Sequence, residues 1–278
     1  METVVVGLDV PPARVEPLRW AAEYCRLAGD ELVGVVAYCP SQSESPPDWY
    51  EEQVADVQKR AEVAMDALAS GVPHRAELRD GDPRDVIPEV AHDDSAVVVV
   101  VGARGNGGFH GLGLGSVAHH LAHKLLTPLV IIPNSGGPLP GGTVVVGLDG
   151  SPNDIATLEW AVQLAEAAEG SVTAVYASDP MAMTFAHPYG ETIADQKEEV
   201  VRAQVALAAA PRVKVSITVE VDHPVPALSR AADQVDASVI VVGRKGASHL
   251  RGVLLGRVPA QLPYHAHRPV AIVPRAAD

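Results

Sequence analysis

Cysteine is scarce in this 278-residue chain, which contains only Cys25 and Cys39 and no Cys-x-x-Cys pair. Two isolated thiols form neither a disulfide framework nor a zinc site, and such usage is typical of a reducing compartment. No apolar run approaches the roughly 18 residues of a membrane-spanning helix, and no charged and apolar leader opens the sequence. We therefore expect a cytoplasmic protein without a membrane partner.

Positive charge and aromatic side chains are also in short supply. Lysine and arginine number 21 against 35 acidic residues, for a net charge of -14, and only 4% of the residues are aromatic. This charge repels nucleic-acid backbones and anionic membranes, so neither is an expected partner. A small anionic ligand stays compatible with it, because helix N-termini and loop amides create local positive potential.

The chain is an internal duplication. The segment Thr-Val-Val-Val-Gly-Leu-Asp at 3–9 recurs unchanged at 143–149, and Val-Val-Val-Gly at 99–102 is answered by Ile-Val-Val-Gly at 240–243. Two domains of ordinary size fit the length of the chain. We predict one domain over 1–134 and a second over 143–278. The linker, 135–142, is rich in Gly and Pro and is predicted to hold neither a helix nor an inner strand.

Each copy alternates short β-branched runs with longer segments of helical period, a pattern typical of βαβ units around a parallel sheet. The predicted fold class is therefore α/β, with two tandem doubly wound five-stranded parallel sheets of Rossmann-like type. Ligands of such sheets bind at the carboxyl ends of the strands beside the topological switch point. The predicted strands lie near 3–9, 31–38, 74–80, 96–102 and 128–133, and near 143–149, 171–177, 213–221, 238–243 and 269–274; the helices of the first copy lie near 14–28, 48–70, 83–93 and 116–126.

A glycine-rich segment follows the fourth strand of the first copy. It reads Gly102-Ala-Arg-Gly105, then nine residues, then Gly115-Ser116 at the start of a helix. Glycines allow backbone amides to approach a ligand, and the amides of Gly115, Ser116 and Val117 are predicted to attract phosphate. A Cβ at Gly115 is expected to intrude on that phosphate. In a second interpretation the glycines only close a turn, and the Ser116 hydroxyl only caps the helix.

The Gly-x2-Gly-x9-Gly-Ser spacing resembles that of ATP-binding universal stress proteins, as do Leu-Arg-Trp-Ala at 18–21 and Gly-Asp-Pro at 81–83. The resemblance covers nearly the whole chain. It implies an adenine nucleotide alpha hydrolase-like fold, ATP as the cofactor with or without Mg²⁺, and a regulatory or sensory role in the stress response. The nucleotide-binding residues that it implies are Asp9, Ala37, Gly102, Arg104, Gly105, Gly115, Ser116 and Val117. For Asp9, a role as a helix N-cap remains an alternative.

The second copy keeps the glycine spacing but replaces the serine with Arg257. Pro259 and Pro263 follow, and the second of these is expected to shorten or kink the helix. Three roles remain open for Arg257: a phosphate ligand, a plug in a vacant site, or a surface ion pair. We expect the nucleotide mainly in domain 1. The equivalent residues of domain 2 are Asp149, Ala177, Gly243, Gly246, Gly256, Arg257 and Val258.

Several further functions and assemblies stay open. The resemblance implies that fifth strands pair across a two-fold axis, so we expect an intramolecular pseudo-dimer, and a further homodimer is compatible with it. The chain has no Gly-Lys-Ser/Thr phosphate loop, no Gly-x-Gly-x-x-Gly after its first strand and no recognisable catalytic triad. An enzyme is therefore not expected beyond slow ATP hydrolysis. The remaining alternatives are a protein-interaction module with empty sites and a cyclic AMP binder.

Histidine pairs and the repeated tryptophan have simpler explanations. His119 and His123 have the i, i+4 spacing of metal ligands on a helix, but no third ligand is indicated, and His265 is discounted for the same reason together with His267. No metal site is predicted. Trp20 and Trp160 occupy the same helical position in the two copies, which indicates a packing role.

Overall fold

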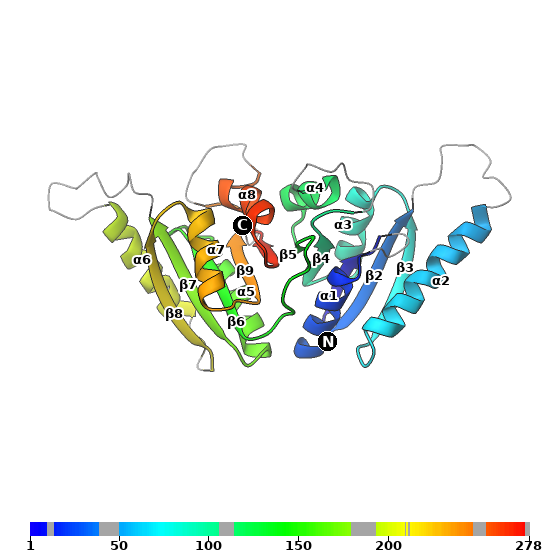
Figure 1. Cartoon of the computed structure of the whole chain (residues 1–278), viewed down its shortest axis with the longest axis horizontal. Helices are drawn as coiled ribbons and strands as arrows, with labels where there is room; N and C mark the ends of the chain where they lie inside the picture. The colour runs from blue at the N-terminus through cyan, green and yellow to red at the C-terminus, as the bar shows by residue number, and fades with distance from the viewer. Residues whose placement is uncertain are drawn as a thin grey trace. The chain divides into compact units, whose positions relative to one another are not determined.

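The structure is a computed structural model that describes residues 1–9, 14–38, 50–105, 114–178, 193–208, 210, 212–246 and 254–275. The chain divides into two compact units, unit 1 from Met1 to Leu139 and unit 2 from Pro140 to Asp278. Each unit has a parallel sheet and four helices among the described residues (Figure 1). Within the described ranges, no helix combines the length and the apolar character that a membrane span requires.

Unit 1 has the strand order β3-β2-β1-β4-β5, and its neighbouring strands are parallel. The chain order therefore reverses direction between β1 and β4, which is the topological switch point. The elements in chain order are β1 (Thr3–Gly7), α1 (Glu16–Ala28), β2 (Glu31–Tyr38), α2 (Tyr50–Leu68), β3 (His74–Asp80), α3 (Pro83–Asp93), β4 (Val98–Gly102), α4 (Ser116–Lys124) and β5 (Leu129–Ile132).

Unit 2 repeats this arrangement with the order β8-β7-β6-β9-β10, again with parallel neighbours. Both sheets match the predicted α/β fold class. The elements are β6 (Thr143–Leu148), α5 (Asp154–Ala167), β7 (Ser171–Ser178), α6 (Ile193–Ala208), β8 (Lys214–Val221), α7 (Pro224–Gln234), β9 (Val239–Gly243), α8 (Arg257–His265) and β10 (Val270–Val273).

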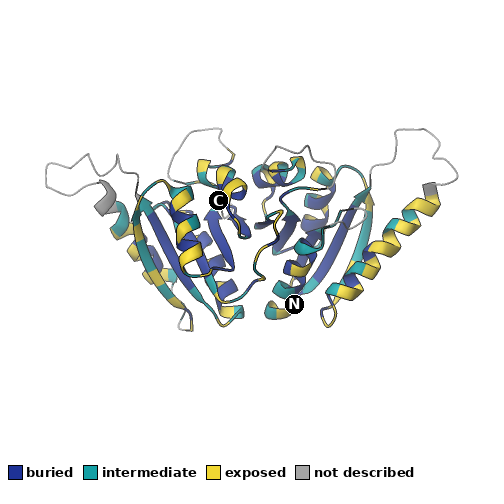
Figure 2. Cartoon of the chain, viewed as in Figure 1, coloured by how far each residue is buried: buried dark blue, intermediate teal, exposed yellow. Residues whose placement is uncertain are grey.

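The central strands are valine-rich because helices cover both of their faces. In unit 1, α1 packs against β1, β4 and β5 and α2 against β2 and β3, whereas α3 contacts β1 and β2 and α4 contacts β5. Val98, Val99 and Val100 consequently have no exposed surface. In Figure 2 the inner strands are dark blue, and α2 turns an exposed face outward. The three-layer, doubly wound arrangement predicted from these unalternating runs is confirmed.

The repeated tryptophan lies in the core of each unit. Trp20 of α1 is 1% exposed and Trp160 of α5 is 8% exposed. The Trp20 ring also stacks on Tyr24, with ring centroids 5.6 Å apart. Burial of such large side chains contributes roughly 1.5–3 kcal/mol each to folding, and the predicted packing role is confirmed.

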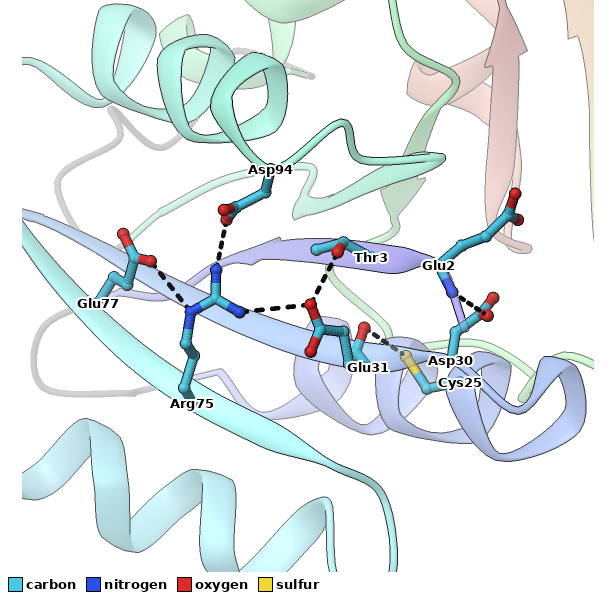
Figure 3. A network of polar contacts seen from close by, with 8 residues as sticks. All are labelled: Glu2, Thr3, Cys25, Asp30, Glu31, Arg75, Glu77 and Asp94. Atoms are coloured by element: carbon cyan, nitrogen blue, oxygen red, sulfur yellow. Dashed lines mark hydrogen bonds and ion pairs between the residues drawn. The ribbon is translucent and has the colours of Figure 1, made fainter.

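A charged network joins the amino ends of the unit 1 strands, at the edge of the sheet away from the strand carboxyl ends (Figure 3). The Arg75 guanidinium contacts Asp94 at 2.6 Å, Glu77 at 3.1 Å and Glu31 at 3.5 Å. The hydroxyl of Thr3 donates to the same Glu31 carboxylate at 2.9 Å. These contacts tie β1, β2 and β3 to the end of α3.

The same figure shows the Cys25 thiol, which donates to the backbone oxygen of Glu31 at 3.6 Å, and the backbone N–H of Glu2, which donates to Asp30 at 2.8 Å. Burial raises the pKa of the Cys25 thiol to about 12. Because the thiolate is the reactive form of cysteine, this side chain acts as a small apolar residue of the core.

Candidate functional site

A cavity of about 460 Å³ opens in unit 1 at the carboxyl ends of β1, β2 and β4. This is the switch point, where open α/β sheets bind ligands. The structure brings all eight residues predicted for domain 1 to its wall: Asp9, Ala37, Gly102, Arg104, Gly105, Gly115, Ser116 and Val117. The rest of the wall, which the motif did not indicate, comprises Gly7, Leu8, Arg14, Pro17, Val35, Pro83, Ile87, Val101, Ala103 and Ala118.

Asp9 lies against the beginning of the glycine-rich segment. A Cβ built on Gly105 would lie only 2.9 Å from Oδ1 of Asp9, so this glycine permits the close approach of carboxylate and loop. The N-cap of α1 is Val15, and no side chain caps this helix. The alternative role of Asp9 as the N-cap of α1 is therefore wrong.

Gly115 closes the turn before α4 rather than offering a free amide. Its N–H donates to the backbone oxygen of Ala103 at 2.7 Å. A Cβ on Gly115 would lie 3.2 Å from that oxygen and 3.3 Å from Cα of Arg104, so it would meet the loop backbone. The expectations that the Gly115 amide is free and that a Cβ there would intrude on phosphate are both corrected by this geometry.

Ser116 is the first residue of α4, and Gly115 is the N-cap, without a side-chain capping bond. The predicted capping role of the Ser116 hydroxyl is therefore wrong. Among the described residues, the N–H groups of Ser116 and Val117 have no acceptor. Both residues line the cavity, so the positive end of the α4 dipole faces it. The segments 10–13 and 106–113, which belong to the predicted loops, lie outside the described residues.

Arg14 is the charged wall residue that the motif missed. It is half-buried just before α1, and its Nη1 donates to Asn134 at the side-chain Oδ1, 2.9 Å away, and at the backbone oxygen, 3.3 Å away. In the alignment of the two copies, Arg14 stands opposite Asp154. That charge reversal was a signal available in the sequence, although the family spacing does not include it.

Unit 2 has a smaller cavity, of about 160 Å³, at the equivalent strand ends. All seven residues predicted for domain 2 line it: Asp149, Ala177, Gly243, Gly246, Gly256, Arg257 and Val258. The sequence prediction did not include Asp154 and Lys245, which also line this cavity. The two cavities thus have the same place in the fold, but they differ in volume and in their charged side chains.

The carboxylate of Asp154 braces the loop after β6. Its Oδ2 accepts the N–H groups of Gly150 at 2.7 Å and Asp149 at 3.0 Å, and its Oδ1 accepts the hydroxyl of Ser151 at 3.3 Å. Burial and the neighbouring charge of Asp149 raise the pKa of Asp154 to about 7 in spite of these donors. Asp154 is 5% exposed, so the carboxylate accepts its hydrogen bonds from the loop and has little contact with solvent.

Two buried amide side chains hold the same loop from other directions. Nε2 of Gln204 on α6 donates to the backbone oxygen of Ser151 at 2.8 Å. Nδ2 of Asn153 donates to the backbone oxygen of Lys245 at 3.3 Å, across to the end of β9. A Cβ on Gly243 would lie 2.5 Å from that same Nδ2. Protein side chains therefore pack closely around the space where the unit 2 cavity begins.

Arg257 lies at the start of α8, between the unit 2 cavity and a neighbouring groove lined also by His223 and His265. It is exposed, and within the described part of the chain it forms no ion pair. The surface ion pair considered for it is therefore not observed there. Helix α8 is nine residues long, as is α4. The expectation that Pro263 shortens this helix is wrong, because α8 continues past the proline to His265.

The histidine pair of α4 lies side by side, with ring centroids of His119 and His123 4.5 Å apart. Nδ1 of His123 is 2.8 Å from the backbone oxygen of His119, so this nitrogen is engaged in a local hydrogen bond. Over the described residues, no three His, Cys, Asp or Glu side chains are grouped as a metal site would require.

Comparison with known proteins gives consistent matches. A sequence model of the universal stress protein family matches residues 1–133 and again 142–274. Universal stress protein Rv1996 of Mycobacterium tuberculosis is 27% identical over 303 residues, covering 97% of this chain and 94% of that protein. A universal stress protein structure from Archaeoglobus fulgidus matches with a TM-score of 0.70 at 18% identity, covering 99% of this chain and 98% of the other.

A further match covers 49% of this chain and 99% of the other, at 31% identity and a TM-score of 0.39. That structure is of a universal stress protein in complex with cAMP.

Proposed function

The chain belongs to the universal stress protein family, with a family unit in each half, and from that premise we propose that it binds ATP in the unit 1 cavity. We further propose that it acts as a regulatory or sensory module of the stress response rather than as an enzyme of fast turnover. The observation that carries the proposal is the meeting of eight motif residues around one cavity at the switch point.

The wall of the cavity has an apolar side and a side suited to phosphate. The apolar side consists of Val35 and Ala37 from β2 with Pro83 and Ile87 from α3, and we assign the adenine ring to it. Toward β4 and α4, the wall is mainly glycine and backbone, and it ends in the amides of Ser116 and Val117, which have no acceptor among the described residues. Amides at a helix N-terminus favour phosphate groups, so we assign the phosphate chain there.

The size of the cavity supports the choice of unit. Ligand pockets have volumes of about 300–1,000 Å³, and the unit 1 cavity, at about 460 Å³, lies within that range. The unit 2 cavity, at about 160 Å³, lies below it, and its wall has the carboxylates of Asp149 and Asp154 beside the cations of Lys245 and Arg257. Because the unit 2 cavity is small and Asp154, Gln204 and Asn153 hold the loop beside it, we place the nucleotide mainly in unit 1.

Magnesium, where present, would reach the site with the phosphates. The only carboxylate on the described wall of the unit 1 cavity is that of Asp9. Mg²⁺ is usually bound through one or two carboxylates together with substrate phosphates and water. Asp9 and the nucleotide itself fit that arrangement, and the protein need not supply a closed cage.

A matched pair of substitutions tests the proposal. Ser116→Glu places a negative charge at the start of α4, where it favours the helix but repels phosphate. Arg257→Glu makes the equivalent change at the start of α8. Heat extraction of the purified proteins followed by nucleotide chromatography identifies a bound nucleotide, and calorimetric titration with ATP, GTP and cyclic AMP gives the affinities.

We expect ATP to bind the wild-type protein and Arg257→Glu alike, and Ser116→Glu to lose it. Purified protein that contains no nucleotide and does not bind added ATP would contradict the proposal and favour an interaction module. Tighter binding of cyclic AMP than of ATP would show that cyclic AMP, and not ATP, is the ligand of the site. Equal loss in the two variants would show that the nucleotide does not distinguish the units.

A further inference from the structure

Arg14 differs from five other arginines of unit 1 in what holds it. Those five each form an ion pair with a carboxylate; they are Arg26, Arg60, Arg75, Arg79 and Arg84. Arg14 instead bonds to two neutral oxygens of Asn134, and over the described residues these are its only hydrogen bonds. Its positive charge is thus held in place without being neutralised.

The direction of this contact places the guanidinium on the phosphate side of the cavity. Arg14 precedes α1, which packs over β1, β4 and β5, and Asn134 follows the end of β5. The contact therefore joins the start of α1 to the end of β5, the strand beside β4, and Gly102 at the end of β4 begins the glycine-rich segment. The side chain of Pro17, also at the start of α1, lies 3.5 Å from where a Cβ of Gly102 would be. The adenine side lies on the opposite flank of β1, beside β2.

The duplicated position in unit 2 has the opposite charge and different partners. Asp154 is buried at 5% exposure and turns toward the amides of its own loop. Arg14 is half-buried on the cavity wall. The cation is therefore a property of unit 1, and the fold shared by the two units does not require it.

We propose that Arg14 is a phosphate-binding residue of the unit 1 site, and that it gives this site its preference for nucleotides with several phosphates. The assignment rests on the proposed nucleotide site. A guanidinium has five N–H donors, and Asn134 accepts only from Nη1, so Nε and Nη2 remain for a bidentate contact with phosphate oxygens. Asn134 sets the orientation of the side chain before the ligand arrives.

Affinities for ATP, ADP, AMP and adenosine, measured by calorimetry on wild type and variants, test this assignment. In Arg14→Gln the charge is lost and an amide remains to contact Asn134. We expect ATP affinity to fall about tenfold or more, AMP affinity to fall less, and adenosine affinity to stay unchanged. Arg14→Lys should retain part of the ATP affinity, because it keeps the charge but not the fork of donors.

The matched control is Arg19→Gln, which removes the same charge from an exposed position of α1 away from the cavity. It should bind all four ligands as wild type does, and thermal melting without ligand should show both variants folded. Wild-type ATP affinity in Arg14→Gln, or an equal loss for ATP and adenosine, would overturn the assignment. If wild type binds none of the four, the proposed nucleotide site fails, and Arg14 loses its role with it.

Discussion

Unit 1 and unit 2 have the same strand order and nearly the same pairing register, with Val4 opposite Val98 in one and Val144 opposite Val239 in the other. Their cavities nevertheless differ, at about 460 Å³ against about 160 Å³. The sheet is conserved between the copies because its valines form the core of each unit. The residues at the strand ends do not build the core, so they were able to diverge.

The loop after the first strand of each unit illustrates this divergence. In unit 2, the loop amides are satisfied by a buried carboxylate, and Gln204 and Asn153 close it from two further sides. In unit 1 the equivalent position is Arg14, which reaches across the sheet edge to Asn134. In unit 2 this position thus binds the backbone of its own loop, whereas in unit 1 it places a positive charge on the cavity wall. Four sets of substitutions test this difference between the units.

The largest expected effect concerns the buried carboxylate of Asp154. Its pKa is about 7 in the folded unit against an ordinary value of 3.8, so the folded protein binds the proton more tightly than the unfolded chain. Stability therefore falls as the pH rises between those values, by on the order of 4 kcal/mol in total. Asp154→Asn cannot ionise, yet its oxygen still accepts the loop amides, so its stability should fall less steeply. Urea unfolding between about pH 5 and pH 8 measures the difference.

Glu159→Gln is the control, because it removes an exposed carboxylate from the same helix. Its stability should follow the wild-type pH profile. A stability difference between wild type and Asp154→Asn that does not change with pH would contradict the buried, raised-pKa carboxylate.

The next largest effect is expected on the stabilisation by ATP, when the glycine that lies against the aspartate after the first strand is replaced in each unit. A Cβ on Gly105 would lie 2.9 Å from Oδ1 of Asp9, and a Cβ on Gly246 would also clash with the carboxylate of Asp149. ATP at about 100 times its dissociation constant should stabilise the wild-type protein by roughly 2.7 kcal/mol. Gly105→Ala should lose most of this gain and Gly246→Ala should keep it. Thermal unfolding with and without ATP gives both values.

The result opposite to this expectation, with the gain lost in Gly246→Ala and kept in Gly105→Ala, would move the nucleotide to unit 2. Each variant is also compared with wild type without ligand, because both substitutions displace a carboxylate and lower the stability of their own unit.

A smaller effect is expected at the amino ends of the strands. Arg75→Met removes the cation shared by Glu31, Glu77 and Asp94, which should destabilise unit 1 by about 1 kcal/mol, because such partly exposed pairs are weak. The loss should shrink in concentrated salt, and ATP affinity should not change. In unit 2, hydroxyl pairs such as Thr143 with Ser171 occupy the equivalent edge, so no matching salt dependence is expected there. Hydrogen exchange followed by mass spectrometry resolves the two units.

The smallest expected effect is the restoration of the unit 1 motif in unit 2. Arg257→Ser recreates the Gly-Ser pair at the start of α8, but it leaves the small cavity and the carboxylates of Asp149 and Asp154 in place. Titration with ATP should therefore show the same number of sites per chain as wild type. A second site in Arg257→Ser would show that Arg257 alone separates the units.

Much of the fold was predictable because the local pattern of apolar residues indicates where strands and helices form. Periodicity places β1 and β4 within two residues of their observed bounds, Thr3–Gly7 and Val98–Gly102, since runs of buried β-branched residues fit only a covered strand. The glycine spacing likewise indicated residues that do meet at one cavity, because the carboxyl ends of parallel strands lie at one edge of a sheet.

The details of the site were less predictable. The amide of Gly115 donates to the backbone oxygen of Ala103, and the N-cap of α4 is Gly115 rather than Ser116. Neither fact follows from residue type, because both depend on how closely the turn passes the end of β4. The role of Arg14 depends on Asn134, which is 120 residues away in sequence.

By itself, the amino-acid sequence determined that this protein is a duplicated α/β chain with a glycine-rich segment after the fourth strand of each copy, because periodicity and repetition are local properties. Only the tertiary structure decided which side chains face each cavity, that Asp154 turns inward, and that Arg14 keeps its charge beside neutral oxygens. Those outcomes depend on contacts between segments distant in the chain, where burial and the nearest charges set what each group can do.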